Sequence, residues 1–115
     1  MFCTVKTSSG LQAGDVVAWN GSEFALASSL ATPLGVLNEA PTQDTDDNFY
    51  YAPVIFAGVA WARCSRDIPV EGGELQVENG RVYVDNSADG AGIIAPLPKG
   101  QTAKLTGDLV MIHIR

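Results

Sequence analysis

Residues 16–27 read Val16-Val17-Ala18-Trp19-Asn20-Gly21-Ser22-Glu23-Phe24-Ala25-Leu26-Ala27, and this stretch decides the fold class. Two short apolar segments flank Asn20-Gly21, and both of these residues tolerate the positive φ that a type I′ turn requires. The stretch therefore predicts a β-hairpin, with Phe24 and Leu26 on one face of the returning strand.

Outward from this hairpin, short β-rich runs alternate with turns that contain glycine. The sequence predicts further strands at Phe2–Lys6, Pro33–Leu37, Tyr50–Arg63, Glu74–Val77, Arg81–Asp85, Gly92–Leu97 and Leu109–Ile114. Tyr50–Arg63 is the longest of them, with Gly58 expected at a bulge or a close backbone approach. A second hairpin is expected around Glu78-Asn79-Gly80. Because no stretch of ten residues has a convincing helical period, we expect an all-β fold: a small sandwich or barrel of short antiparallel strands with glycine-rich turns.

The size of the chain fits one domain. It has 115 residues, 46% of them apolar, with 12 glycines and 6 prolines, a composition that favours a folded, turn-rich domain over a disordered chain or a helical bundle. We expect residues 1–10 to form an N-terminal arm or a first strand, and residues 11–115 to form a single β domain.

A faint internal echo runs through the chain. Residues 14–20 are similar to residues 80–86, and a Leu-Gln pair precedes each run, at Leu11-Gln12 and at Leu75-Gln76. An apolar run follows each block, at Pro33–Leu37 and at Gly92–Leu97. Two similar β units packed together would produce this echo, and so would chance among glycine-rich hairpins.

The charge of the chain argues against several partners. Seven basic residues against 13 acidic ones give a net charge of −6, and the basic residues are scattered, so we expect no direct nucleic-acid ligand. The longest apolar stretch, Ala52–Ala62, is interrupted and too short to span a bilayer, and residues 1–7 lack the pattern of a signal peptide. We therefore expect no membrane partner and synthesis in a cytoplasm.

Few residues offer catalytic or metal chemistry. His113 lies in a predicted strand with no nucleophile near it in sequence, and Cys64 has two arginines close by but no recognisable base. Cys3 and Cys64 could pair, although two buried thiols are the favoured interpretation for a cytoplasmic chain. No glycine pattern forms a phosphate cradle. We expect no enzyme activity and no cofactor.

The acidic segment Asn38–Asn48 is predicted to be a long exposed loop. Asp44, Asp46 and Asn48 stand where the first, third and fifth ligands of a calcium-binding loop would be, but Phe49 replaces the required glycine and Ile55 the required glutamate. A solvated acidic loop is the expected structure, and a looser calcium site stays an alternative.

Aromatic residues suggest a contact surface. All of them fall in or next to predicted strands, so most are expected in the core. Tyr50 and Tyr51 are consecutive and would point to opposite faces of a strand, so one of them is a candidate anchor for a partner. Core packing of both is an equal alternative.

The order of short motifs resembles a family of small phage virion proteins, the capsid decoration, cement or head-fibre base proteins. The shared elements are Leu11-Gln12-Ala13-Gly14-Asp15-Val16-Val17, Leu34-Gly35-Val36, Ala57-Gly58-Val59-Ala60, Gly73 with Leu75, Gly80-Arg81-Val82-Tyr83-Val84-Asp85 and Gly107-Asp108-Leu109-Val110-Met111-Ile112. Together they extend from residue 11 almost to the last residue. The loop Asn38–Asn48 is longer and more acidic than the family pattern, which leaves its role open.

The resemblance implies a β sandwich or barrel that forms a homotrimer on the outside of an icosahedral head. Its partner would be the major capsid protein, and its location the surface of the virion. An N-terminal arm could add a strand to a capsid edge, although an ordinary first strand is the slightly favoured alternative. The candidate partner-interface residues are Phe2, Thr4, Lys6, Tyr50 and Tyr51.

Two other functions remain open. A carbohydrate-binding or receptor-binding module of a phage tail or fibre would need Trp19 and Trp61 exposed as stacking platforms. A small hydrolase would need carboxylates such as Asp15, Asp85 and Asp108 gathered around a pocket.

Overall fold

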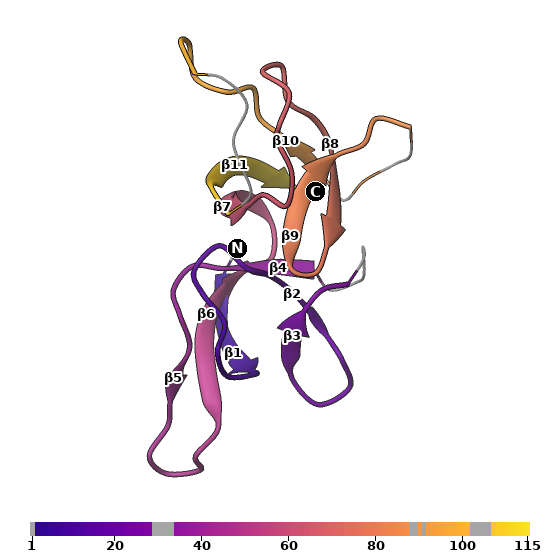
Figure 1. The fold of residues 1–115 in the computed structure, drawn as a ribbon. Helices are drawn as coiled ribbons and strands as arrows, with labels where there is room; N and C mark the ends of the chain where they lie inside the picture. The colour runs from indigo at the N-terminus through magenta and orange to yellow at the C-terminus, as the bar shows by residue number, and fades with distance from the viewer. Residues whose placement is uncertain (1, 29–33, 88–89, 91, 102–106) are drawn as a thin grey trace.

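The computed structural model describes residues 2–28, 34–87, 90, 92–101 and 107–115 (Figure 1). These residues form eleven strands and no helix, so the all-β prediction is confirmed. The molecule is elongated, 47 × 26 × 22 Å, because its strands are divided between two sheets that lie one above the other in Figure 1.

Each sheet curls into a small barrel. The first barrel contains β1 (Phe2–Thr7), β2 (Val16–Trp19), β3 (Phe24–Leu26), β4 (Leu34–Leu37) and β6 (Tyr50–Ile55). Their order is β1-β3-β2-β4-β6, and β6 pairs back with β1 along its whole length. The two-residue strand β5 (Thr42–Gln43) extends the sheet beside Tyr50 and Tyr51.

The second barrel contains β7 (Gly58–Arg63), β8 (Gly73–Glu78), β9 (Arg81–Val84), β10 (Gly92–Ile94) and β11 (Leu109–Ile114), in the order β7-β11-β10-β8-β9. A parallel bridge between Cys64 and Val82 brings its first and last strands together.

The two barrels have the same topology, residue by residue. Val17 pairs with Leu26 in the first barrel as Leu75 pairs with Val84 in the second. The closing contact is also repeated: the N–H of Ser8 donates to the carbonyl of Phe24 (3.0 Å), and the N–H of Ser65 donates to that of Val82 (2.9 Å). The chain therefore consists of two copies of one five-stranded unit.

This repeat corrects the internal echo seen in the sequence. The echo matched residues 14–20 with residues 80–86, which places β2 on β9, whereas the pairing makes β8 the counterpart of β2. The second part of the echo holds, since Gly35 and Gly92 occupy equivalent positions in β4 and β10. Because β8 and β9 are neighbouring strands of one hairpin with similar apolar runs, the sequence match fell on β9 instead of β8.

Two local predictions are also corrected. Tyr50–Arg63 is not one strand but two, β6 and β7, joined at Phe56-Ala57 where the chain passes from one barrel to the other. Phe56 packs on the core of the first barrel. Gly58 has φ +91° with open space around it, so the positive φ and not a close approach favours glycine there.

The hairpin at residues 16–27 is confirmed, but its turn lies one residue later than predicted. Asn20 pairs with Glu23, so Gly21 and Ser22 are the tip, and Gly21 has a positive φ while Asn20 does not. Asn20 instead uses its Oδ1 to accept hydrogen bonds from the N–H groups of Ser22 and Glu23, both at 3.0 Å. The type I′ turn occurs in the second hairpin, where Asn79 and Gly80 both have positive φ.

Each barrel has its own apolar interior, built from equivalent positions. Val17, Phe24, Leu37, Ala52 and Val54 fill the first, and Leu75, Val82, Ile94, Val110 and Ile112 fill the second. The sequence of the last strand predicts Val110, Ile112 and Ile114 on one face and Met111 and His113 on the other. This alternation is confirmed in β11, whose even-numbered residues are buried and whose odd-numbered residues are exposed.

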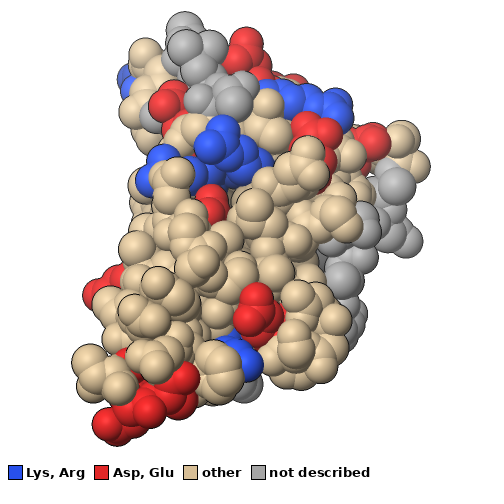
Figure 2. Space-filling model, turned by 60° about the horizontal axis from the view of Figure 1, so that its bottom comes forward, with Lys and Arg blue, Asp and Glu red and all other residues tan. Residues whose placement is uncertain are grey.

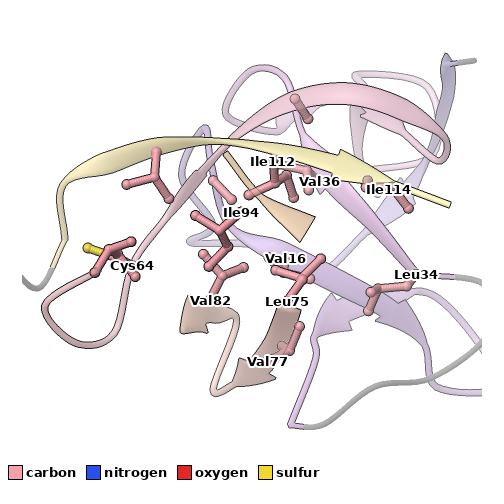
Figure 3. Close-up of a cluster of buried hydrophobic side chains, with 14 of the residues drawn as sticks. Val16, Leu34, Val36, Cys64, Leu75, Val77, Val82, Ile94, Ile112 and Ile114 are labelled. Atoms are coloured by element: carbon pink, nitrogen blue, oxygen red, sulfur yellow. The ribbon is translucent and has the colours of Figure 1, made fainter. Parts of the chain in front are cut away.

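The barrels are held together by a buried contact between the side of the first and one end of the second. Val16, Leu34 and Val36 lie outside the first barrel and share one buried cluster with Ala60, Val77 and Ile114 of the second. Figure 3 shows Val16, Leu34 and Val36 gathered with residues of the second barrel. Burying each such valine stabilises the fold by roughly 1.5–3 kcal/mol.

Polar contacts fix the angle between the barrels. The N–H of Val16 donates to the carbonyl of Gly80 (2.8 Å), and the N–H of Gly80 donates to that of Ala27 (2.7 Å). The Arg63 side chain donates to the carbonyls of Ala13 (3.0 Å) and Gly107 (2.9 Å).

Candidate interaction surfaces

The structure brings most of the predicted interface residues to one outer face. Thr4 pairs with Pro53, Lys6 with Tyr51 and Phe2 with Ile55 along β1 and β6. Tyr50 belongs to the other face, because it pairs with the buried Thr7. We call Thr4, Lys6 and Tyr51 the first-barrel face. β1 is an ordinary strand, hydrogen-bonded to β6 over its full length, and is not available as a free arm in this structure.

Contacts at the end of the β5–β6 hairpin order this face. The Lys6 ammonium lies 3.7 Å from the centre of the Phe49 ring, and the Tyr51 hydroxyl donates to Asp47 Oδ2 at 2.7 Å. This hydrogen bond raises the pKa of Tyr51 and lowers the pKa of Asp47. Lys6 and Tyr51, directly opposite each other in the sheet, thus both contact residues at the end of the β5–β6 hairpin.

The acidic loop uses its carboxylates to shape turns. Asp44 Oδ1 accepts from the N–H of Asp46 (2.7 Å), and Asp47 Oδ1 accepts from that of Phe49 (2.8 Å). No group of three potential metal ligands was found among the described residues. Figure 2 shows acidic side chains gathered at the end of this hairpin, far from the basic side chains of the second barrel, with a broad uncharged area between.

The candidate catalytic groups Cys64 and His113 lie apart from the two pockets described below. Cys64 is fully buried, and burial raises the pKa of its thiol, which keeps it protonated. His113 is exposed on β11. Neither residue lines the two pockets described below. Cys3 and Cys64 are not joined, and Cys3 is exposed, so the prediction of two buried thiols is right only for Cys64.

Two of the three candidate carboxylates serve turns. Asp15 Oδ2 accepts from the N–H of Gln12 (2.8 Å), and Asp85 Oδ1 accepts from the N–H of Ser87 (3.0 Å). These bonds hold the two groups in separate turns, one in each barrel.

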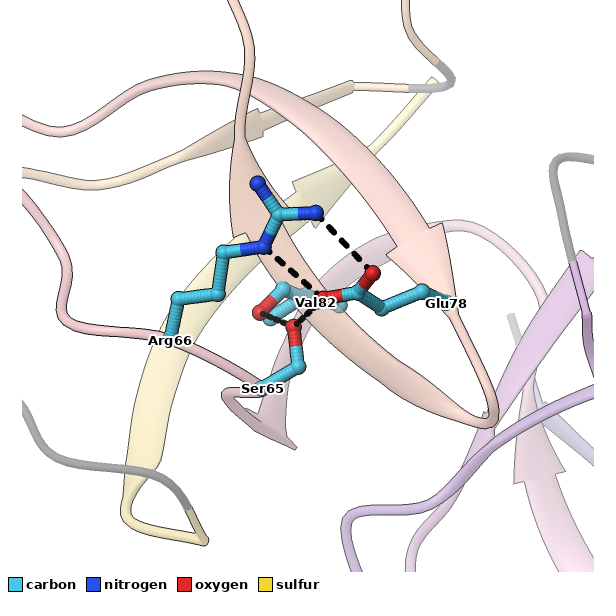
Figure 4. Close-up of polar contacts among 4 residues, drawn as sticks. All are labelled: Ser65, Arg66, Glu78 and Val82. Carbon is cyan, nitrogen blue, oxygen red and sulfur yellow. Dashed lines mark hydrogen bonds and ion pairs between the residues drawn. The ribbon is translucent and has the colours of Figure 1, made fainter.

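A cluster of polar side chains joins Ser65 and Arg66 to the second hairpin (Figure 4). Glu78 accepts from Arg66 (2.9 and 3.0 Å) and from the Ser65 hydroxyl (2.7 Å), and Arg66 also stacks on Tyr83. These hydrogen bonds, chiefly that of Arg66, lower the pKa of Glu78 to about 2. The cluster binds the segment after β7 to the hairpin, which is a structural role.

An exposed apolar face on the second barrel was missed by the sequence interpretation. Val59 and Trp61 on β7, Leu109 and Met111 on β11 and Ile93 on β10 are 40–60% exposed. Trp61 pairs with Met111, and His113 lies between Val59 and Ile93, so the five side chains share one outer face of three adjacent strands, with His113 among them. We call these five residues the second-barrel face. Two of its residues, Trp61 and Leu109, occupy the positions that Thr4 and Tyr51 occupy on the first barrel.

Trp61 stands between two shallow pockets. One, of about 130 Å³, has walls from Ala95–Pro98, Gln101 and Met111. The other, of about 190 Å³, lies at the junction of the barrels and includes Val36 and Ile55 of the first barrel with Leu109 of the second. Each has room for about one side chain.

The aromatic residues are less buried than expected. Trp19 is 50% exposed, Phe49 48% and Trp61 53%, and of the aromatic residues whose burial is described only Phe24 is buried, which corrects the expectation that most aromatics lie in the core. In β7 the inward positions are Ala60 and Ala62, and the larger Val59 and Trp61 point outward. Because both sets are apolar, hydropathy could not tell which face of this strand is the core; the small size of the two alanines was the available signal.

Comparisons with known proteins found no match: no family model, no curated protein and no solved structure is similar to this chain. Among the described residues, none forms a helix long and apolar enough to cross a bilayer.

Proposed function

We propose that this chain is a structural subunit that decorates the outside of an icosahedral phage head, where it binds the major capsid protein and associates as a trimer. The observation that carries the proposal is the second-barrel face, on which five large apolar side chains are exposed across three strands. Contiguous patches of this kind mark surfaces that contact another protein. The order of motifs shared with decoration proteins supports the choice of partner.

A decoration subunit makes two kinds of contact, with the shell and with its own copies, and the two barrels offer two faces of different character. Permanent contacts between subunits are more apolar than contacts that form on an assembled partner. We therefore assign the second-barrel face to contacts between copies. The first-barrel face, with Thr4, Lys6 and Tyr51, is assigned to the shell.

The energetics of such a subunit are simple. A subunit that binds only the assembled shell stabilises it by mass action. Three linked copies, each with a modest contact, bind far more tightly than one copy.

The test is to mix the purified protein with undecorated heads and to measure co-sedimentation and the temperature at which the heads rupture. We expect binding and a higher rupture temperature. Lys6→Glu should weaken binding strongly, and Lys99→Glu, the same change at an exposed lysine outside both faces, should not. Equal binding by the two variants, or none by the wild type, would contradict the proposal.

A second function is favoured by one observation: Trp19 and Trp61 are both half exposed, as a carbohydrate-binding module requires. Tryptophan fluorescence measured during titration with oligosaccharides tests it. A saturable change that disappears in Trp61→Phe or in Trp19→Phe would support sugar binding, and a flat titration would exclude the sugars tested.

A further inference from the structure

Because the two barrels have the same topology, the same end of each barrel can be compared. One end of the second barrel is lined by Ala60, Val77 and Ile114, all at most 5% exposed. The strand pairing gives their counterparts in the first barrel. Cys3 is the counterpart of Ala60, because Cys3 pairs with Val54 as Ala60 pairs with Ile112. Trp19 is the counterpart of Val77, because Trp19 pairs with Phe24 as Val77 pairs with Val82. Phe56 follows β6 at the position of Ile114 in β11.

The equivalent end of the first barrel is uncovered. Cys3 is exposed, Trp19 is half exposed and Phe56 is only partly buried. Trp19 packs on Phe24 (5.4 Å between ring centres), and Phe24 packs on Phe56 (5.3 Å), so three rings close this end, the buried Phe24 between the more exposed Trp19 and Phe56.

The chain itself shows what covers such an end. Val16 and Val36, on the outside of the first barrel, pack over the end of the second barrel and are 1% and 2% exposed. The internal contact is therefore a barrel end against an apolar barrel side. One more barrel end and one more apolar side, the second-barrel face, are left exposed on the same molecule.

We infer that a second copy of this chain covers the end of the first barrel with its second-barrel face. Trp61 and Met111 of that copy would pack on Trp19, Cys3 and Phe56, and aromatic and methionine side chains are enriched at the centres of such contacts. The contact joins two different surfaces, so it repeats head to tail and closes into a ring when the rotation allows. The inference rests on the proposed function only for the number of copies in the ring; the contact itself needs no shell.

Two charged variants test the contact by light scattering on the purified protein at micromolar concentration. Cys3→Glu alters the barrel end and Trp61→Glu the face; both side chains are exposed, so both variants should fold, which circular dichroism checks. We expect a wild-type oligomer and two monomeric variants. Val59→Glu is a second face variant, and Val70→Glu, at a site 53% exposed and outside both surfaces, should leave the oligomer intact.

Mixing the two monomeric variants gives the sharpest result. Cys3→Glu retains an intact face and Trp61→Glu an intact barrel end, so an equimolar mixture should form dimers that grow no further. A monomeric wild type, or a mixture that stays monomeric, would overturn the inference, whereas loss of head binding by an oligomeric protein would overturn only the proposed function.

The reactivity of Cys3 gives an independent measurement. A maleimide should label Cys3 several-fold more slowly in the wild-type oligomer than in monomeric Trp61→Glu, although residue 61 is far from residue 3 in the sequence. Cys64, which is fully buried, should stay unlabelled in both and reports on unfolding. Equal labelling of Cys3 in the oligomer and the monomer would contradict the inference.

Discussion

Val16 in the first barrel and Glu74 in the second stand at the same place in the same topology, yet one is buried and the other carries a charge. Val16 pairs with Val36, and Glu74 pairs with Ile93. Val16 lies beneath the other barrel, whereas Glu74 forms an ion pair with Arg115 at the surface. The position in the fold decides which residues point outward. The neighbour decides whether an outward position has to be apolar.

The largest expected effect on the free energy of unfolding comes from giving one of these positions the residue of its counterpart, in two single variants. Val16→Glu would bury an unpaired charge between the barrels and should lower the free energy of unfolding by about 4 kcal/mol. Glu74→Val should change it by less than about 1 kcal/mol, because an exposed ion pair contributes little. Urea unfolding of both variants measures the difference. Similar losses of unfolding free energy in the two variants would show that the burial of Val16 and the surface position of its counterpart do not differ in energy.

Gly35 and Gly92, the shared glycines of β4 and β10, give the next effect. A Cβ at Gly92 would strike the backbone carbonyl of His113, while at Gly35 it would strike the side chains of Val54 and Phe56. Backbone cannot move aside as a side chain can, so Gly92→Ala should cost about 3 kcal/mol and Gly35→Ala clearly less. Thermal unfolding ranks the two, and the reverse order would contradict the comparison.

Arg63 and Lys6 are the third pair of equivalent residues, because each precedes the residue that closes its barrel. Arg63 donates to two carbonyls and ties the barrels together, so Arg63→Met should cost about 2 kcal/mol. Lys6→Met removes one exposed contact with Phe49 and should cost about 0.5 kcal/mol. Chemical denaturation measures both, and equal losses would argue that Arg63 does not link the barrels.

The smallest effect concerns acid stability. Glu78 and Asn20 are equivalent in the two hairpins, but only Glu78 titrates. Its pKa is lowered from 4.5 to about 2 in the folded protein, so its stabilising contribution is complete above pH 4.5 and is lost as the pH falls toward 2. Glu78→Gln should flatten the dependence of stability on pH in this window, and Arg66→Gln should do the same. An unchanged pH dependence in both variants would show that this cluster does not contribute.

The local structure could be predicted well where one short stretch contains all the information. Both hairpins were predicted correctly, because a glycine turn between apolar runs is a local signal. The alternation of β11 was predicted for the same reason. The turn predicted at Asn20-Gly21 was wrong by one residue, because Asn20 accepts hydrogen bonds from the turn with its side chain and is not itself in the turn. Tyr50–Arg63 misled because both β6 and β7 are apolar across the point where the chain changes barrels.

The contact surfaces were only half visible. Thr4 and Lys6 were named as part of an N-terminal arm and Tyr51 from the alternation of a strand, and the structure places all three on one face. The second-barrel face was missed because Trp61 and Met111 look like core residues in an apolar strand. The uncovered end of the first barrel could not be found at all without the repeat as a reference.

By itself, the sequence determined the hairpins, the all-β class and the residues that alternate along each strand, because those properties depend on neighbours a few positions away. The tertiary structure alone decided that the strands form two equivalent barrels, that Val16 is buried where Glu74 lies at the surface in an ion pair, and that Trp19 and Trp61 reach solvent. The physical reason is that burial depends on what packs against a strand from elsewhere in the chain, and the composition of the strand does not record that.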